Sequence, residues 1–374
     1  MSYYLTFPSS SSALPKYPKF VPFCLSYIVL VILLSLSCCE AKIKLPEGLD
    51  VPAIIAFGDS IVDQGMNNYI KTVVKADFEP YGADLNNGKP SGRFCNGRTP
   101  ADLVASELGI KELVPAYLDP HLKAQDFITG VSFASGGTGY DPQTPQIVSV
   151  IPLTTQVTYF KEYIAKLKGF VGEERANYII GNALYLVVAG SDDLANTYFT
   201  VGLRKLHYDI PSYADLMVSS ASGFIQELYK LGVRRYVVLG APPIGCLPSQ
   251  RTLAGGLLRN CKDEYNQAAQ IVNSKLERAI ESLSNKLSGS RVVYVDIYNP
   301  ILDLILHPQN HGFEVVEKGC CGTGDLEVAI LCNKHSPTCS DHSKYVFWDS
   351  YHPTERAYKV LVSDVLEKYI NRFV

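Results

Sequence analysis

The sequence lacks an excess of charge of either sign. Only 19% of its 374 residues are charged, and the formal net charge is −3. No stretch is basic enough for a nucleic-acid interface, and no run of like charges is long enough for an interaction tail. With 47% hydrophobic residues, the composition is that of an ordinary globular enzyme.

Several common motifs are also missing. No Gly-, Ser- or Pro-rich linker separates long periodic segments and no internal repeat is found, so one domain over 42–374 is favoured although the length would allow two. The absence of Gly-x-Ser-x-Gly argues against a hydrolase with a nucleophile elbow. The glycines at 136–139 have neither a P-loop lysine nor dinucleotide-binding spacing. No Asn-x-Ser/Thr sequon is present, so N-glycosylation is not expected.

Residues 1–41 read as a signal peptide. Lys16 and Lys19 precede a mostly apolar run over 21–39, and small residues follow it. The alternative is a membrane anchor, because the run approaches the length that spans a bilayer. Polar residues within the run and the lack of a following basic flank favour cleavage. We therefore expect a secreted, extracellular protein with no stable membrane anchor.

The cysteines fit secretion. Beyond the expected signal there are seven: Cys95, Cys246, Cys261, Cys320, Cys321, Cys332 and Cys339. In an oxidising compartment this odd set predicts up to three disulfides, one between Cys246 and Cys261 and two within 320–339, with Cys95 as the free thiol. A zinc site is the rival interpretation of the 320–339 cluster, but the paired ligand spacing of zinc sites is missing.

The apolar pattern predicts an α/β fold. Short buried-looking strands are expected at 53–57, 127–133, 184–189, 236–239 and 292–295, and helices at 155–169, 213–231, 262–287 and 354–371. Alternating strands and helices of this kind form a mostly parallel sheet covered on both faces. The irregular stretches 63–100 and 297–348 are expected to form walls of a site.

The stretch around Ser60 carries the first candidate chemistry. The strand at 53–57 ends at Gly58, and Asp59 and Ser60 follow where a parallel sheet presents functional groups. A helix starting just after Ser60 would offer free N–H groups to a developing oxyanion. The alternative is that Asp59 and Ser60 only cap that helix.

Two further glycine-bearing turns follow apolar strands, at 133–139 and 188–193. All three turns are expected along one edge of the sheet, where small residues let backbone N–H groups approach a ligand. Each turn taken alone is equally well explained as a tight connection. Their combination favours an oxyanion-binding edge.

Near the C-terminus, Asp349 and His352 are three residues apart just before the last expected helix. One turn can bring both side chains together, so that the carboxylate holds the imidazole while it takes a proton from a serine. A capping aspartate and an incidental histidine would be the plainer interpretation. The chain order Ser, Asp, His in an α/β protein favours serine hydrolysis.

Six blocks then carry a resemblance to a known family. They are Phe57-Gly-Asp-Ser-Ile-Val-Asp63 with Gly65, Ser91-Gly-Arg-Phe-Cys-Asn-Gly-Arg-Thr99, Phe133-Ala-Ser-Gly-Gly-Thr-Gly139, Gly190-Ser-Asp-Asp193, Gly240-Ala-Pro-Pro-Ile-Gly-Cys246 and Asp349-Ser-Tyr-His352. In this order they resemble the plant secreted GDSL esterase/lipases of the SGNH hydrolase superfamily. The resemblance implies a three-layer α/β/α flavodoxin-like fold with a mostly parallel five-stranded sheet.

The resemblance also implies a function and its residues. Carboxylic esters, possibly of lipids, would be hydrolysed through an acyl-serine, with Ser60 as nucleophile, His352 as base and acid, and Asp349 as its orienter. The oxyanion donors would be the backbone N–H groups of Ser60 and Gly136 and the side chain at position 192. No metal, cofactor or nucleic acid is implied; the expected partner is an ester substrate, and the protein is expected to be a monomer.

The sequence departs from the family pattern at Ile61, a conservative change, and at Asp192, where an asparagine is expected. An ionised carboxylate cannot donate a hydrogen bond and repels an oxyanion. Asp192 would have to be protonated, turn away, or weaken the enzyme. One alternative function is an acyltransferase, which would use the same three residues to pass the acyl group to an alcohol. Another, motivated by Asp192, is a catalytically weak binding protein.

Overall fold

The computed structural model describes residues 2–4, 46–85 and 87–373. The chain divides into two units, Met1–Lys42 and Ile43–Val374. In the first unit the structure describes only residues 2–4, where Tyr3 and Tyr4 are exposed. The expected signal peptide at 1–41 lies almost wholly outside the described residues and stays a prediction. Among the described helices, none combines the length and apolar character needed to cross a bilayer.

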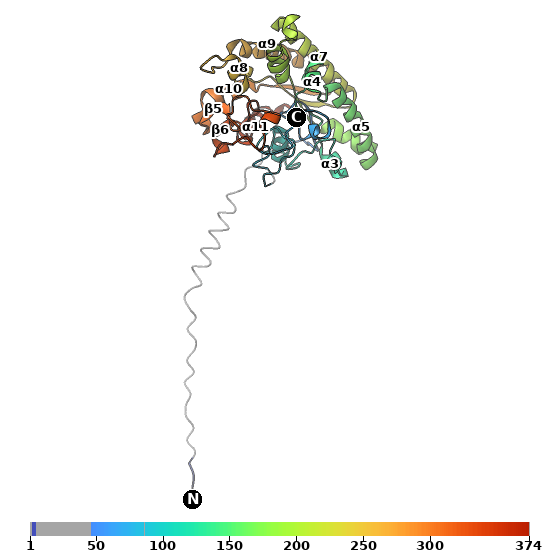
Figure 1. Cartoon of the computed structure of the whole chain (residues 1–374). Helices are drawn as coiled ribbons and strands as arrows, with labels where there is room; N and C mark the ends of the chain where they lie inside the picture. The colour runs from blue at the N-terminus through green and yellow to red at the C-terminus, as the bar shows by residue number, and fades with distance from the viewer. Residues whose placement is uncertain (1, 5–45, 86, 374) are drawn as a thin grey trace. The chain divides into compact units, whose positions relative to one another are not determined.

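The folded unit is an α/β structure (Figure 1). Its strands are β1 (Ile54–Gly58), β2 (Leu184–Val188), β3 (Arg235–Leu239), β4 (Arg291–Val295), β5 (Val315–Gly319) and β6 (Tyr345–Phe347). Its α-helices are α2 (Pro100–Glu107), α3 (Ala124–Thr129), α4 (Gln143–Val148), α5 (Leu153–Val171), α6 (Glu173–Asn182), α7 (Ile210–Lys230), α8 (Pro248–Ala254), α9 (Asp263–Lys286), α10 (Tyr298–Leu306) and α11 (Glu355–Tyr369). A π-helix forms η2 (Asp193–Thr200), and 3₁₀ turns form η1 (Met66–Tyr69), η3 (Arg204–Leu206), η4 (Ile244–Cys246), η5 (Pro308–His311), η6 (Ala329–Leu331), η7 (His342–Lys344) and η8 (Ile370–Phe373). The four long helices expected from the sequence are confirmed as α5, α7, α9 and α11.

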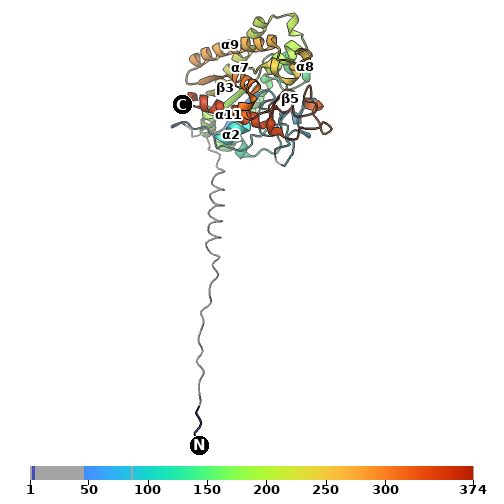
Figure 2. The ribbon, with the colours of Figure 1, turned by 90° about the vertical axis from the view of Figure 1, so that its left-hand side faces the viewer.

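The main sheet is parallel, with the strand order β1-β2-β3-β4. Figure 2 shows α7 and α9 on one side of β3, and α2 and α11 on the other. These three layers confirm the expected fold class. Because parallel strands end at the same edge, Gly58 of β1 lies beside Val188 of β2, and the turns that follow them are neighbours.

The prediction of a fifth strand over 127–133 is wrong for most of that range. Its first half belongs to α3, and only Ser132 pairs with the sheet, through a single parallel bridge to Ala56. Gly130 separates the two parts at a φ of 95°, and a Cβ there would lie 1.9 Å from the Ile54 carbonyl oxygen. The extended segment that remains after Gly130 is too short for a regular strand, and the main sheet in the described residues has four strands.

Alternate residues of the strands face the two helical layers, as the period of a strand requires. Phe57 faces α5 and α7, where its ring lies 5.4 Å from that of Phe160 and 5.5 Å from that of Phe224. It also stacks on Phe133 at 5.1 Å. This aromatic packing fixes β1, and with it the turn that carries Ser60.

The expected disulfides are confirmed. Cys246 pairs with Cys261, Cys320 with Cys339 and Cys321 with Cys332, and Cys95 is a buried free thiol. Among the described residues, the Cys320 and Cys339 sulfurs and His342 lie close enough to suggest a metal site. Both sulfurs are committed to one disulfide, and His342 Nδ1 bonds Asp84 at 2.9 Å, so the geometry gives zinc no support.

The disulfide-linked segment supports the strand that leads into the C-terminal candidate site. The N–H of Cys320 donates to the Phe347 carbonyl at 3.1 Å, and that of Cys321 to the Trp348 carbonyl at 2.8 Å. Asp349 is the next residue. The two disulfides of this segment thus constrain the backbone that carries the Asp349 carboxylate.

Candidate active site

Ser60 lies in a turn at the carboxyl end of β1, as expected, but no helix starts directly after it. Asp59 Oδ1 accepts the Ile61 N–H at 3.1 Å, and Asp63 Oδ1 accepts those of Gly65 and Met66 at 2.8 and 2.7 Å. These side chains bind the N–H groups in a series of turns, and the next α-helix is α2. The expected helix N-terminus at Ser60 was therefore wrong.

Asp349 and His352 lie on one turn before α11, which Thr354 caps by accepting the Ala357 N–H. Asp349 Oδ2 and Oδ1 lie 2.8 and 2.9 Å from His352 Nδ1, and His352 Nε2 lies 2.7 Å from Ser60 Oγ. Because an ionised carboxylate only accepts, Nδ1–H donates to it and Nε2 accepts the serine hydroxyl. The three residues singled out from the sequence are thus one hydrogen-bonded chain in which a proton can pass from Ser60 to His352.

Asp349 is fully buried and its two oxygens have further donors. Oδ1 accepts the N–H groups of Tyr351 and His352 at 2.8 and 2.7 Å, and Oδ2 accepts the Tyr81 hydroxyl at 2.8 Å. Burial and the neighbouring Asp349 raise the pKa of Tyr81 well above its ordinary value, so its hydroxyl stays protonated. Sequence analysis missed Tyr81, because 268 residues separate it from Asp349 and no motif marks it.

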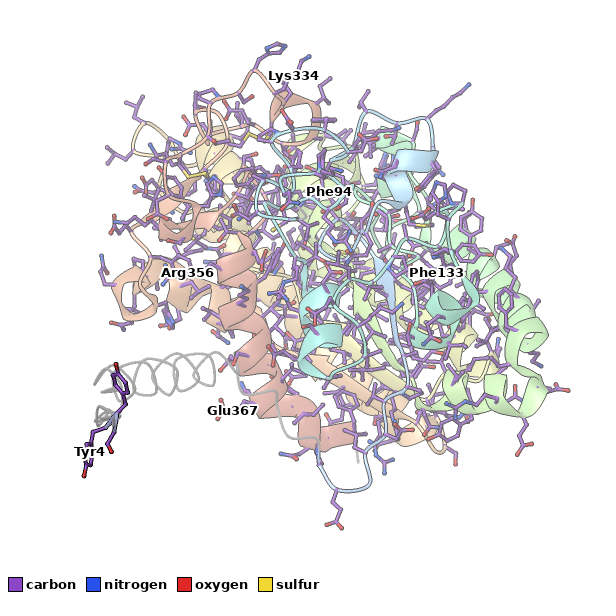
Figure 3. The ribbon with its side chains drawn as sticks, turned by 90° about the horizontal axis from the view of Figure 1, so that it is seen from below. Tyr4, Phe94, Phe133, Lys334, Arg356 and Glu367 are labelled. Atoms are coloured by element: carbon purple, nitrogen blue, oxygen red, sulfur yellow. A yellow bond between two sulfur atoms is a disulfide. The ribbon has the colours of Figure 1, made fainter. Side chains whose placement is uncertain are left out.

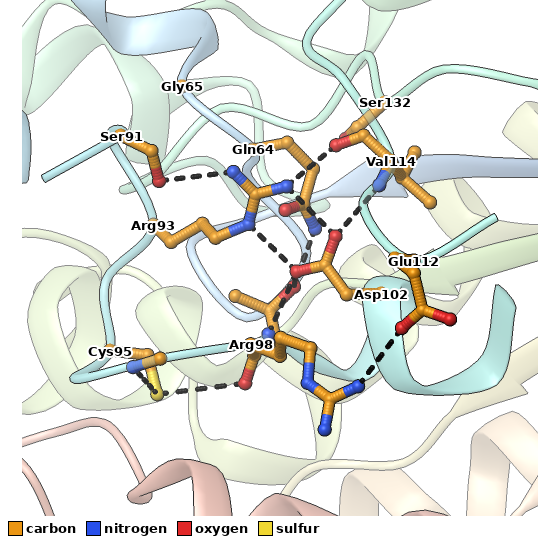
Figure 4. A network of polar contacts seen from close by, with 12 residues as sticks. Gln64, Gly65, Ser91, Arg93, Cys95, Arg98, Asp102, Glu112, Val114 and Ser132 are labelled. Atoms are coloured by element: carbon orange, nitrogen blue, oxygen red, sulfur yellow. Dashed lines mark hydrogen bonds and ion pairs between the residues drawn. The ribbon is translucent and has the colours of Figure 1, made fainter. Parts of the chain in front are cut away.

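Phe94 supports the other side of the imidazole, with its ring 5.3 Å from that of His352. Figure 4 shows how its loop is held: the buried Arg93 forms two bonds with Asp102, at 2.7 and 2.8 Å, and also binds Ser91. This loop was expected to line the site. The contribution of its buried ion pair to placing Phe94 could not be read from the sequence.

Gly136 is close to Ser60, but its N–H is already used. It donates to Asp63 Oδ2 at 2.8 Å. A Cβ at Gly136 would lie 2.6 Å from the Phe94 ring and 3.3 Å from Ser60 Cβ, so only glycine permits this packing. Within 46–85 and 87–373, the N–H groups of Ser60 and Gly137 have no acceptor, and both residues line the same cavity. The sequence-based prediction of Gly136 as an oxyanion donor stays a prediction, and in this structure its N–H is bound to Asp63.

Asp192 follows β2 and lines the cavity with Ser60. Its Oδ1 accepts the Asn196 amide at 2.6 Å, and Asn196 Oδ1 accepts the Tyr351 hydroxyl at 2.7 Å. Burial raises the pKa of Asp192 to about 6, although His352 and Asn196 oppose the shift. A proton is therefore available at this position under mildly acidic conditions.

Asp59 adds a second carboxyl to this edge. It is buried, and its Oδ2 has no partner among the described residues. Burial, and then the charge of Asp192, raise the pKa of Asp59 well above its ordinary value. Two carboxyl groups that each disfavour the charge of the other retain a proton more readily than either alone.

A cavity of about 370 Å³ opens beside Ser60 and His352. Its other walls are mainly apolar and come from β2, β3, α11 and both long irregular stretches, including Val74, Phe94 and Val328. The expectation that these stretches wall the site is confirmed. A mostly apolar cavity with a few convergent polar groups is typical of a small-molecule site.

Comparison with known proteins agrees with the geometry. A family model for GDSL-like lipase/acylhydrolase matches residues 54–365. Among Arabidopsis thaliana proteins, GDSL esterase/lipase EXL3 is 59% identical over 93% of this chain and 95% of its own length. GDSL esterase/lipase At1g20120 is 52% identical over 86% and 80%, and EXL2 is 46% identical over 92% and 94%, respectively. The chain therefore belongs to the GDSL-like lipase/acylhydrolase family of hydrolases.

Proposed function

We propose that the protein hydrolyses carboxylic esters through an acyl-serine intermediate. His352 Nε2 takes the Ser60 proton while Oγ attacks the ester carbonyl carbon, and then gives that proton to the departing alcohol. Water, deprotonated in turn by His352, attacks the carbonyl carbon of the acyl-serine. The bond from that carbon to Oγ breaks, His352 returns the proton to Ser60 Oγ, and the acid is released. Asp349 orients the imidazole through Nδ1–H and stabilises its cation.

The observation that carries this proposal is the unbroken chain from Asp349 through His352 to Ser60 Oγ, with the last contact at 2.7 Å. Residues from opposite ends of the folded unit meet there, in the lining of a mainly apolar cavity. An isolated capping aspartate and an incidental histidine would have no reason to do so.

We further propose that the oxyanion is bound at the Ser60 N–H, at the turn formed by Gly136 and Gly137, and at protonated Asp192. Since Asp63 occupies the Gly136 N–H, the free N–H of Gly137 is the donor from that turn. Secretion is also proposed, because three disulfides indicate an oxidising compartment.

The test is covalent labelling of the purified mature protein with a fluorophosphonate, alongside Ser60→Ala and hydrolysis of p-nitrophenyl acetate. We expect labelling and hydrolysis by the wild type and neither by the variant. A folded wild type that is neither labelled nor active would refute the proposal. Adding a competing alcohol and analysing the products distinguishes hydrolysis from acyl transfer.

A further inference from the structure

The π-helix η2 lines the candidate active site along one side. Asp192, which is its N-terminal cap, and two of its residues, Asn196 and Thr200, all line the cavity beside Ser60. A π-helix closes its hydrogen bonds over five residues instead of four, so its turn is longer and side chains four residues apart lie nearly in line. Such turns are rare and occur frequently at functional sites. The three side chains therefore form one row along the cavity wall.

The rest of η2 holds this row in place. Asp193 Oδ2 accepts the Tyr140 N–H at 2.7 Å, and the Thr197 hydroxyl lies 2.8 Å from that of Thr144 in α4. Asp193, Thr197 and Thr144 are all buried. Because residues 193 and 197 are bound to the segment around α4, the helix cannot rotate, and Asn196 stays at the cavity.

A chain of hydrogen bonds with a single direction ends at Asp192. The Gln250 amide donates to the Tyr351 hydroxyl at 3.1 Å, and that hydroxyl donates to Asn196 Oδ1 at 2.7 Å. The Asn196 amide then donates to Asp192 Oδ1 at 2.6 Å. Burial raises the pKa of Tyr351 to about 12, so its hydroxyl keeps the proton that it donates. Since Asn196 accepts through its oxygen, its nitrogen must face Asp192, and a proton on that carboxyl is left to Oδ2.

Tyr351 connects this chain to the histidine. It directly precedes His352, and its backbone N–H donates to Asp349 Oδ1 at 2.8 Å. These residues lie in the turn before α11, whose first turn carries Arg356 (Figure 3). Within 46–85 and 87–373, only Asn196 has hydrogen bonds to both Tyr351 and Asp192.

We propose that Asn196 is a positioning residue for the oxyanion site. It fixes the rotation of the Asp192 carboxyl, leaves the proton of that carboxyl on Oδ2, and couples it to the turn that carries His352. An oxyanion donor contributes most when it is held in place before the reaction begins. Asn196 acts through Asp192 and not on the reacting atoms, so this inference rests on the proposed function and on the role proposed there for Asp192.

The groups around Asp192 decide the sign of the pH effect. Asp59 faces it from the turn after β1, and the two carboxyls each disfavour the charge of the other. His352 and the Asn196 amide both favour the charged form of Asp192. Removing the amide therefore raises the pKa of Asp192 further, and the carboxyl keeps its proton to a higher pH.

The test is kcat and KM for p-nitrophenyl acetate at pH 5.5, with Asn196→Leu alone and combined with Asp192→Ala. Leucine has nearly the size of asparagine and no hydrogen-bond donor in its side chain. We expect kcat to fall about tenfold in Asn196→Leu with KM unchanged, because a bond to an ionisable carboxyl is lost. In the Asp192→Ala background the same substitution should cause no further loss. Asn196→Ala is the alternative variant if leucine prevents folding.

A pair of matched variants tests the rest of the chain. Tyr351→Phe removes the bond that orients the Asn196 amide, and kcat should fall about fivefold. Tyr198→Phe makes the same change in η2 itself, where the hydroxyl donates to the Tyr208 carbonyl at 3.0 Å and is not part of the cavity lining. It should leave kcat unchanged, so equal losses in the two variants would contradict the proposal.

The outcomes separate this inference from the proposed function. Ser60-dependent hydrolysis that Asn196→Leu leaves unchanged, or that it lowers about tenfold again in the Asp192→Ala background, would overturn the inference and leave the esterase standing. If no ester is turned over, carbon-13 NMR titration of the aspartate carboxyls in Ser60→Ala decides. The pKa of Asp192 should rise by about one unit when Asn196→Leu is added, and an unchanged pKa refutes the coupling.

Discussion

Replacing Asp192 by asparagine should change how the activity depends on pH. Asp192 lines the cavity, and its Oδ1 accepts a hydrogen bond from the Asn196 amide, which leaves Oδ2 free to carry a proton. Burial raises the pKa of this carboxyl to about 6, so it can donate a hydrogen bond below that pH and loses the ability above it. Asparagine keeps the acceptor for Asn196 and supplies a permanent N–H donor.

The magnitude follows from the protonated fraction. With a pKa of about 6, half of the molecules carry the proton at pH 6 and about one in a hundred at pH 8. One oxyanion donor is worth roughly 2.7–4 kcal/mol, a factor of about 10² to 10³ in kcat. The ratio of kcat for Asp192→Asn to kcat for the wild type should therefore rise about tenfold per pH unit above 6. It should level off once it reaches the factor of about 10² to 10³ that one oxyanion donor contributes to kcat.

The assay is kcat for a p-nitrophenyl ester between pH 5.5 and 8.5, corrected for the rate of Ser60→Ala at each pH. Thermal unfolding of both proteins at each pH checks that the substitution leaves the fold intact. A ratio that stays constant over this range would refute the role of Asp192 as a protonated donor.

Three further outcomes are expected. Tyr81→Phe removes a hydrogen bond to Asp349, which is worth about 1.5–3 kcal/mol when the acceptor is charged. In steady-state kinetics kcat should therefore fall roughly tenfold or more while KM stays unchanged. A tenfold rise in KM with an unchanged kcat would contradict this. Burial raises the pKa of Asp63 to about 6 and of Asp193 to about 7. Since these values exceed the unfolded one, their contribution to stability is complete below pH about 4 and is lost as pH rises through 6 and 7, so urea unfolding should show lower stability at pH 8 than at pH 5. Gly136→Ala drives a methyl group into the Phe94 ring and toward Ser60; fluorophosphonate labelling should slow by an order of magnitude or more, and an unchanged rate would show that this packing is dispensable.

The sequence alone determined the features that depend on neighbours along the chain. Gly58 ends a strand before Ser60, and the spacing of Asp349 and His352 fits one turn, so both positions were found from local pattern. The four long helices followed from apolar periodicity, because a helix that covers a sheet must bury one face. Three disulfides were predicted for the same reason: each closes a loop within one segment.

Tertiary structure alone decided the contacts between distant segments. Tyr81 meets Asp349 across 268 residues, and Asp63 takes the Gly136 N–H across 73, and neither contact has a periodic signal. The expected fifth strand was lost because α3 takes its first half and the positive φ of Gly130 interrupts the rest, which its apolar pattern did not show.

The cavity beside Ser60 is the clearest case. Its Val237 and Val362 are indistinguishable in the sequence from core residues in full contact, and only the spacing between the sheet and α11 leaves room beside them. Hydrophobic pattern fixes which side chains turn inward, whereas the volume left between packed layers depends on all of them together.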